Sequence, residues 1–369
     1  MKIKAAVLYE MGADRPYRQS QPVQIEQVEL APPGPGEVLV KVAAAGVCHS
    51  DLSVVNGNRP RQMPMVLGHE ASGVIERVGE GVTQLSAGDH VVFVFMPSCG
   101  ACDMCLGGRP SLCTRGFASN GAGTLLSGAT RLSRDGQPLY HQVGVSCFAE
   151  YAVVDQSSLV KVDPDLPLED AALFSCAVIT GVGAVMNTAA MPKGASAAIV
   201  GLGGTGLAAL MGAKVSGAST IAGFDLLPEK RAKAMSLGAD SVYDPMTEGI
   251  AEQVGGFDYV FECVGNVQAM EFAYGITKMG GTTVSSGLSH PERKFAIHHV
   301  DLVAKEKTIK GSYLGSCLVK RDIPHYIALF QQGRLPVDQL ITRSIGLEEL
   351  NEAFDRLADG SELRQVIMF

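Results

Sequence analysis

A glycine-rich turn between an apolar run and a helical segment constrains the fold of this chain more than any other feature. The apolar run Ala195–Val200 leads directly into Gly201–Gly206, which reads Gly-Leu-Gly-Gly-Thr-Gly, and an alanine- and leucine-rich segment follows. Strand, glycine turn and helix in this order start a doubly wound parallel sheet, in which a dinucleotide pyrophosphate sits at the helix N-terminus. A purely structural glycine turn is the alternative, because the motif alone is weak evidence.

Each spaced glycine of this turn has its own expected task. Gly201 permits the tight turn, Gly203 lets the pyrophosphate approach the backbone, and Gly206 lets the helix pack closely on the strand. Asp225 ends the next apolar run, 19 positions after Gly206. A carboxylate at that place accepts hydrogen bonds from the ribose hydroxyls and repels a 2′-phosphate, so the sequence favours NAD over NADP.

The length and spacing of the apolar segments differ between two parts of the chain. Before about residue 170 the apolar runs are short and interrupted by glycine and proline, which is typical of an irregular β domain. After it, strands alternate with helical segments, which predicts a parallel sheet with helical crossovers. We therefore expect a β-rich domain over 1–177 and 315–369 and a nucleotide domain over 178–314.

The expected elements follow from these patterns. The strands are predicted at residues 38–43, 74–78, 90–95, 148–154, 195–200, 220–224, 259–263, 282–286, 308–314 and 364–369. The helices are predicted at residues 171–190, 205–216, 229–237, 324–332 and 347–357. The run 114–140 is rich in glycine, serine and threonine and is expected to form a long loop.

Composition excludes several classes of protein. Hydrophobic residues make up 46% of the chain, which is typical of a globular protein, and the net charge of −8 argues against a nucleic-acid partner. No apolar run approaches the roughly 20 residues of a membrane helix, so no membrane association is expected. The first ten residues alternate like a strand and lack the apolar core of a secretory signal, which predicts a cytoplasmic protein.

Four of the nine cysteines gather in one short segment, at Cys99, Cys102, Cys105 and Cys113. An odd number of cysteines in a chain without a signal argues against a disulfide framework. Four thiolates around one point suit tetrahedral Zn²⁺, and a closed all-cysteine shell is a structural site. An iron–sulfur cluster, a zinc module for nucleic acid and an unliganded loop are the alternatives.

A second set of candidate ligands is spread along the chain. Cys48 and His69 lie in the β-rich part, and Cys176 lies at the start of the alternating part. Two thiolates and one imidazole around an open position form a catalytic zinc shell. Each residue alone is weak evidence, since a lone cysteine is usually a small core residue. Their weight comes from their local contexts together with the nucleotide fingerprint.

Taken together, these motifs resemble the medium-chain zinc-dependent alcohol dehydrogenases over essentially the full length of the chain. The matching pieces, in order, are GVCHSD, GHE, GDHV, the four-cysteine segment, the cysteine of LFSC, GLGGTG, Asp225 and LRQVIMF. The long segment after Cys113 is similar to the liver-type, long-loop branch. The resemblance implies a Rossmann domain and a GroES-like catalytic domain with a structural zinc lobe. It also implies two zinc ions per chain (one catalytic, one structural), NAD, a small alcohol or aldehyde substrate, and a homodimer or tetramer.

The resemblance also implies roles for single residues. The catalytic zinc would be held by Cys48, His69 and Cys176, and the structural zinc by Cys99, Cys102, Cys105 and Cys113. Ser50 would hydrogen-bond the substrate oxygen, Glu70 would lie beside the zinc, and Asp51 would steady a zinc ligand. The implied cofactor contacts are His49, Thr180, Gly201, Gly203, Gly204, Thr205, Gly206, Asp225, Lys230 and Arg364. The implied pocket residues are Phe95, Gln142, Val143, Leu288 and Tyr313.

Two departures from the family pattern bear on the chemistry. Ser53 stands where liver-type enzymes often place the histidine that ends the proton relay, so proton exit would use water, the ribose or His49. Asn58 and Arg59 replace acidic residues expected of glutathione-dependent formaldehyde dehydrogenases, which makes that activity the alternative rather than the leading one.

We expect a reversible interconversion of a primary alcohol, aromatic or medium-chain, and its aldehyde. Four other functions remain open at this point. They are a glutathione-adduct formaldehyde dehydrogenase, a polyol dehydrogenase, a zinc-free quinone reductase, and a zinc- and NAD-binding regulatory protein without turnover.

Overall fold

The computed structural model describes residues 1–369, which cluster into two compact units. The first unit holds Met1–Cys176, Leu318–Ile327 and Ile341–Phe369, and the second holds Ala177–Cys317 and Ala328–Leu340. The predicted division put 1–177 and 315–369 in the first domain and therefore differs at Ala177, at Gly315–Cys317 and at Ala328–Leu340. The last of these segments belongs to the second unit because its 3₁₀ turn, Val337–Leu340, contacts helix α7 (Gly204–Val215).

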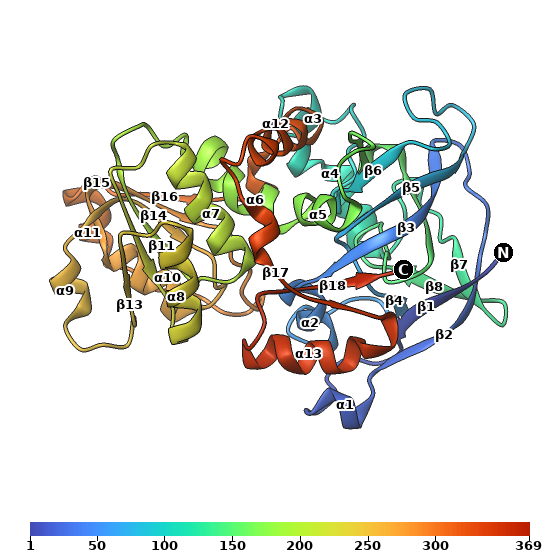
Figure 1. Ribbon diagram of the computed structural model, residues 1–369, viewed down its shortest axis with the longest axis horizontal. Coiled ribbons are helices and arrows are strands. Elements are labelled where there is room, and N and C mark those ends of the chain that lie inside the picture. The colour runs from blue at the N-terminus through green and yellow to red at the C-terminus, as the bar shows by residue number, and fades with distance from the viewer. The chain divides into compact units, whose positions relative to one another are not determined.

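A six-stranded parallel sheet forms the second unit (Figure 1). Its spatial order is β13-β12-β11-β14-β15-β16, so the strand order reverses at β11, which is the arrangement of a doubly wound nucleotide-binding sheet. The strands are β11 (Ser196–Val200), β12 (Thr220–Phe224), β13 (Ser241–Tyr243), β14 (Phe257–Glu262), β15 (Thr277–Ser285) and β16 (Thr308–Gly311). The helices of this unit are α6 (Ala177–Gly183), α7 (Gly204–Val215), α8 (Pro228–Leu237), α9 (Ile250–Val254), α10 (Val267–Gly275) and α11 (His299–Ala304).

Two predicted elements of this region differ from the structure. The helix expected over 171–190 is broken at Cys176, whose φ of −143° and ψ of −71° are not helical. It becomes α5 (Leu168–Ala172), a 3₁₀ turn, α6 and a π-helical turn. The strand expected over 308–314 ends at Gly311, because the chain then turns into a 3₁₀ segment, Leu314–Ser316.

The first unit contains two β systems built around β3 (Glu37–Val47) and β1 (Lys2–Leu8). A seven-stranded sheet has the order β10-β6-β5-β3-β18-β17, with β9 also paired to β3. It comprises β5 (Ala71–Val78), β6 (His90–Phe93), β9 (Tyr151–Asp155), β10 (Leu159–Lys161), β17 (Ile341–Ile345) and β18 (Arg364–Met368) besides β3. A closed barrel comprises β1, β2 (Val23–Leu30), β4 (Met65–Val66), β7 (Leu132–Arg134) and β8 (Gln137–His141).

The run 114–140, expected as a loop, contains structure. It holds helix α4 (Thr114–Ala122) and the hairpin of β7 and β8, which completes the barrel. Leu132 and Leu139 are paired across this hairpin and buried in the barrel core. The remaining helices of the unit are α1 (Tyr17–Ser20), α2 (His49–Val55), α3 (Asp103–Leu106) and α13 (Leu350–Asp359). Helix α12 (Val319–Gln331) begins in this unit, and its residues from Ala328 on belong to the second unit.

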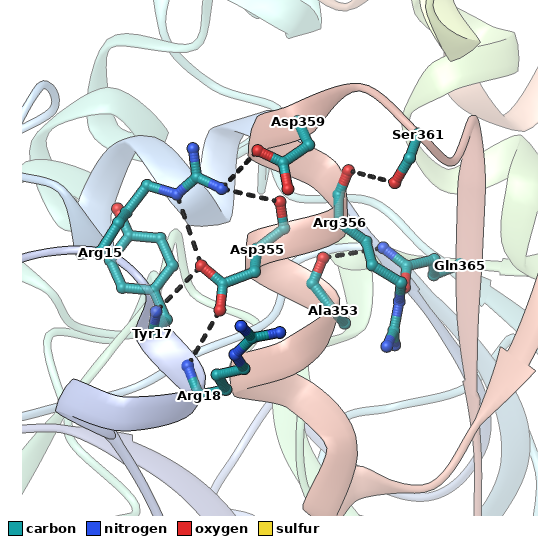
Figure 2. Close-up of polar contacts among 9 residues, drawn as sticks. All are labelled: Arg15, Tyr17, Arg18, Ala353, Asp355, Arg356, Asp359, Ser361 and Gln365. Carbon is teal, nitrogen blue, oxygen red and sulfur yellow. Dashed lines mark hydrogen bonds and ion pairs between the residues drawn. The ribbon is translucent and has the colours of Figure 1, made fainter.

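A carboxylate holds the short N-terminal helix α1 against α13 (Figure 2). Asp355 of α13 accepts hydrogen bonds from the backbone N–H groups of Tyr17 and Arg18, at 2.9 and 3.0 Å. Arg15 bridges Asp355 and Asp359 from the other side of the same cluster. A four-residue helix is too short to be stable by itself, so these contacts fix its place.

No single helix is long and apolar enough to cross a membrane. One bent pair of helical segments, Leu168–Ser175 with Ala177–Ala189, has the length and composition for a membrane span.

Candidate metal centres and nucleotide site

Four ligand-type side chains from distant parts of the sequence meet inside the first unit. The ligand atoms of Cys48, His69, Glu70 and Cys176 all lie within 4.8 Å of one another. All four residues are buried. Nε2 of His69 is buried and has no hydrogen-bond partner, as expected of an imidazole nitrogen that faces a metal ion.

Local backbone features bring these ligands together. Cys48 caps α2, and Gly68 precedes His69 with a φ of +99°. A Cβ at Gly68 would lie 2.4 Å from the backbone nitrogen of Phe148, so only glycine fits there. The helical break at Cys176 puts its thiol into the cluster, which explains why the predicted continuous helix fails at this residue.

One carboxylate joins two of these ligands. Oδ1 of Asp51 lies 2.7 Å from Nδ1 of His69, and Oδ2 accepts a hydrogen bond from the backbone N–H of Cys48 at 3.0 Å. With Asp51 ionised, Nδ1 carries the proton and Nε2 is left as the electron-pair donor. A carboxylate behind a ligating histidine fixes the tautomer and the orientation of the ring.

Charged groups surround the cluster on its buried side. Nη1 of Arg364 lies 3.3 Å from Oε2 of Glu70 and donates to the carbonyl of Val47 at 3.2 Å. Burial raises the pKa of the Glu70 carboxyl to about 7, although the charge of Arg364 opposes this. A hydrogen bond from the Cys176 thiol and the charge of Arg364 hold the pKa of the Cys48 thiol well below its usual value, against the effect of burial. A thiolate and a free imidazole nitrogen fit a bound zinc ion.

The second cysteine cluster lies in a small lobe of the same unit. The sulfur atoms of Cys99, Cys102, Cys105 and Cys113 lie within 4.8 Å of one another. The Cys113 sulfur accepts hydrogen bonds from the backbone N–H groups of Cys99 and Gly116, each at 3.3 Å. Hydrogen bonds from the backbone of Cys105 and Thr114 lower the pKa of Cys102 to about 5, whereas burial raises the pKa of Cys105 to about 12. Backbone donors to sulfur favour the charged thiolate that a metal needs.

The dinucleotide fingerprint Gly201–Gly206, called the fingerprint turn below, forms the turn after β11 and the first residues of α7 in the second unit, and its glycines differ in what surrounds them. Gly201 has a φ of +90°, and a Cβ at Gly206 would lie 1.7 Å from the carbonyl oxygen of Gly201. Packing therefore requires both glycines. A Cβ at Gly203, in contrast, would meet no atom within 4 Å. The open space at Gly203, beside the N-terminus of α7, fits a dinucleotide pyrophosphate.

Asp225 follows β12 and holds the fingerprint turn. Its Oδ2 accepts from the backbone N–H of Leu202 at 2.8 Å, and its Oδ1 accepts from Leu227 at 3.0 Å. The other implied cofactor residues of this unit lie on helices: Gly204 and Thr205 begin α7, Lys230 lies in α8, and Thr180 lies in α6. His49 and Ser50 are exposed in the first turn of α2, in the first unit.

Comparison with known proteins decides the family. Residues 34–164 match the family model of the alcohol dehydrogenase GroES-like domain, and residues 204–332 match that of the zinc-binding dehydrogenases. A class-3 alcohol dehydrogenase of Drosophila melanogaster is 38% identical, over 99% of this chain and 97% of the relative. The chain belongs to the medium-chain zinc-dependent alcohol dehydrogenases.

Two further relatives support the same family. An S-(hydroxymethyl)glutathione dehydrogenase of Synechocystis sp. is 37% identical to this dehydrogenase over the whole of both chains. The crystal structure of benzyl alcohol dehydrogenase from Acinetobacter calcoaceticus has a TM-score of 0.93 and 32% identity, covering 100% of this chain and 99% of the other. This dehydrogenase is an oxidoreductase that works with zinc and a nicotinamide dinucleotide.

The predicted pocket residues are found in different surroundings. The ring of Phe95 meets the ring of His69 edge-on, with centroids 5.5 Å apart. Leu288 and Tyr313 belong to the second unit, and Leu288 is exposed. Val143 follows Gln142 and has a positive φ of 44°.

Gln142 differs most from the expectation. Its side chain is 3% exposed and bonds to the protein at both ends, to the backbone of Gly68 and to Asp51. Both polar atoms of its amide are therefore used in contacts beside the candidate ligands. Sequence reasoning missed this, because Gln142 and Asp51 are 91 positions apart and no local pattern joins them.

Proposed function

We propose that this dehydrogenase reversibly interconverts a primary alcohol and its aldehyde, with a catalytic zinc held by Cys48, His69 and Cys176. The observation that carries the proposal is the buried group of ligand atoms within 4.8 Å of one another, with His69 Nε2 unpartnered. Three protein ligands and a remaining open position are the shell of a catalytic zinc site. When bound, the zinc withdraws electrons from the substrate oxygen, and the dinucleotide carries the hydride.

Side chains of the protein carry the proton of the substrate hydroxyl away from the site. Ser50 lies in the first turn of α2, two positions after Cys48, and is exposed. We assign its hydroxyl to relay the proton: its oxygen would accept the proton of the substrate alcohol while its own proton leaves to the next group on the way out. Ser53, one turn further along α2, has a hydroxyl that is not a base near neutral pH, so the proton leaves through water, the ribose or His49.

The second zinc of the chain is proposed for the lobe of Cys99, Cys102, Cys105 and Cys113. Four sulfurs close the coordination shell and leave no position for a substrate, so this ion would be structural. The membership of the chain in a zinc-dependent family, shown over nearly its whole length, supports zinc here over an iron–sulfur cluster.

We propose NAD rather than NADP as the dinucleotide. Asp225 follows β12 next to the fingerprint turn, and both of its carboxylate oxygens accept backbone hydrogen bonds from residues of the adjoining turns. A carboxylate so fixed at the end of the second strand accepts from ribose hydroxyls and repels a 2′-phosphate. The remaining proposed contacts are His49, Thr180, Gly201, Gly203, Gly204, Thr205, Gly206, Lys230 and Arg364.

A glutathione-adduct activity is the second candidate. The names of two relatives at 38% and 37% identity, a class-3 alcohol dehydrogenase and an S-(hydroxymethyl)glutathione dehydrogenase, favour it. The sequence Asn58-Arg59 opposes it, because a cationic side chain replaces the acidic residues expected for that substrate. The structural likeness to benzyl alcohol dehydrogenase supports an aromatic alcohol instead.

A substrate panel separates the two candidates. NADH formation is followed on protein of measured zinc content, with aromatic and medium-chain alcohols, and with formaldehyde in the presence and absence of glutathione. We expect NADH from the alcohols without glutathione, and loss of this activity in Cys48→Ser. Turnover only with formaldehyde and glutathione would replace the leading proposal with the second one. Unchanged turnover in Cys48→Ser would refute zinc catalysis.

We also propose a homodimer in the cytoplasm. The strand β16 is the edge of the sheet in the second unit, and the neighbouring helix α11 exposes Val300 and Val303. An unpaired strand edge beside exposed apolar side chains suits pairing with a second copy. All nine cysteines are free, which suits a reducing compartment. Light scattering of the purified protein measures the assembly.

A further inference from the structure

We infer that Gln142 is a positioning residue of the proposed catalytic zinc site. Its side-chain amide fixes the Asp51 carboxylate, which in turn orients the His69 ring and the Cys48 backbone. The inference rests on the proposed function, since it concerns the same metal site. It adds a residue that the family resemblance places in the substrate pocket.

Both ends of the Gln142 amide are used inside the protein. Nε2 donates a hydrogen bond to Oδ1 of Asp51 at 2.9 Å. Oε1 accepts a hydrogen bond from the backbone N–H of Gly68 at 2.5 Å. Gly68 directly precedes His69, so one amide touches both the residue before the histidine ligand and the carboxylate behind it. The side chain is 3% exposed, which leaves it shielded from competition by water.

The Asp51 carboxylate serves three donors at once. Oδ2 accepts from the N–H of Cys48, and Oδ1 is shared by Nδ1 of His69 and Nε2 of Gln142. Asp51 itself is fully buried. Loss of the Gln142 donor would leave an uncompensated electron pair on Oδ1 in a dry site, and the carboxylate would turn to recover a partner. Such a turn moves the ring that must present Nε2 to the metal.

Gln142 is itself held firmly enough to act as a support. It follows the end of β8, and its backbone N–H donates to the hydroxyl of Ser146 at 2.9 Å. The Ser146 hydroxyl donates in turn to the carbonyl of Val66 at 2.7 Å, and β4 (Met65–Val66) pairs with β8. The amide therefore projects from a turn tied to the barrel at both sides. Residues bonded to the partner of a metal ligand affect metal affinity through the geometry of that ligand.

The test compares zinc affinity in the wild-type protein and in Gln142→Met. Methionine has nearly the same length but neither donates nor accepts strongly. Zinc binding is measured by competition with a chromogenic chelator, which reports two ions per chain separately, and by the d–d absorption of cobalt-substituted protein. We expect about 10–100-fold weaker binding of one ion and unchanged binding of the other. The cobalt spectrum of the weakened site should shift, because its imidazole ligand is reoriented.

A second variant and a control separate positioning from simple destabilisation. Gln142→Leu removes both the donor to Asp51 and the acceptor for the Gly68 N–H without adding a titratable group, and it should also weaken the binding of one zinc ion. Asn351→Leu removes another buried amide of the same unit, which bonds Val23 on both sides, and it should lower stability without changing either zinc affinity. The inference is overturned if both Gln142 variants bind two zinc ions with wild-type affinity and spectrum. A wild-type chain that binds no ion at Cys48, His69 and Cys176 would overturn the proposed function and this inference together.

Discussion

Nδ1 of His69 lies 2.7 Å from Oδ1 of Asp51, and the two side chains are 3% and 0% exposed. This contact decides which nitrogen of the ring is available to a metal. It also explains why a carboxylate three positions after Cys48 is tolerated in the core, since every oxygen of Asp51 has a hydrogen-bond donor. A buried carboxylate without such partners would cost several kcal/mol.

The first prediction concerns this contact. In Asp51→Asn the side chain keeps one oxygen but loses the charge that favours the proton on Nδ1 of His69. We expect zinc affinity at this site to fall by about 10–100-fold and activity to fall with it. Chelator competition and single-turnover rates measure the two effects. The four-cysteine site is an internal control, because its zinc should be retained, and equal loss from both sites would contradict the prediction.

The second prediction concerns the proton. Ser50→Ala removes the hydroxyl that is proposed to accept the substrate proton, and kcat/KM should fall by about 10²–10⁴-fold. Ser50→Thr keeps a hydroxyl at the same place and should retain most of the activity. Zinc content should stay at the wild-type value in both variants, since Ser50 is exposed and is not among the clustered ligands. Similar losses in the alanine and threonine variants would show that the hydroxyl has no role.

The features of the structure that the sequence predicts are those made by residues close together in the chain. The β11–turn–α7 unit follows from local order, because strand periodicity, glycine spacing and an alanine-rich helix lie side by side in the chain. The four-cysteine group also follows from a local motif, whereas Cys48, His69 and Cys176 are joined through the family resemblance, and the structure brings the side chains of each group together. The break at Cys176 does not follow from local order, since 171–190 is alanine-rich, mostly apolar and suited to a helix, and a tertiary requirement overrides that propensity.

The same argument explains the other differences. The hairpin of β7 and β8 is hidden in a polar, glycine-rich run, because its strands are only three and five residues long. The segment Ala328–Leu340 joins the second unit through contacts with α7, which lies more than a hundred positions earlier. Gln142 supports the metal cluster across a similar distance. The pattern of residues in a single sequence does not show which residues about a hundred positions apart are in contact.

The third prediction uses two glycines of the fingerprint turn. In Gly203→Ala the new methyl group meets no protein atom, so stability should be unchanged and NADH binding should weaken by about tenfold or more. In Gly206→Ala the methyl group overlaps the carbonyl oxygen of Gly201, so the free energy of unfolding should fall by about 1–3 kcal/mol. Fluorescence titration with NADH and urea denaturation measure these quantities. If Gly203→Ala binds NADH as tightly as wild type, the pyrophosphate does not approach this turn.

The fourth prediction addresses the choice of dinucleotide. Asp225→Asn removes the charge that would repel a 2′-phosphate but keeps an oxygen for one of its two backbone donors. The ratio of the dissociation constants for NADPH and NADH should fall by at least about tenfold, or 1.4 kcal/mol. Asp301→Asn is the matched control, because it removes a charge from the partly exposed pair with Lys305 in the same unit. An equal change of this ratio in the control would show that the loss of any negative charge causes the effect, and not the loss of the Asp225 carboxylate.

The last prediction concerns the acid limit of stability at the contact of α1 with α13 (Figure 2). Burial raises the pKa of Asp355, but the N–H groups of Arg18 and Tyr17 and the charge of Arg15 outweigh it, so the folded-state pKa lies below the ordinary value of 3.8. A lowered pKa in the folded state stabilises the fold above the unfolded-state pKa, and this contribution is lost as the pH falls below 3.8 and through the folded value. Asp355→Asn should therefore lower the free energy of unfolding by about 1–3 kcal/mol at pH 7 and reduce its fall between pH 5 and the acid limit.

Asp359→Asn provides the control for that measurement. Asp359 also pairs with Arg15, but its side chain is 61% exposed, and such ion pairs contribute about 0–1 kcal/mol. Urea titrations at several pH values compare the three proteins. If Asp355→Asn loses no more stability than Asp359→Asn, the backbone hydrogen bonds to Asp355 do not anchor the N-terminal helix, and the hold on α1 must come from the burial of Tyr17 alone.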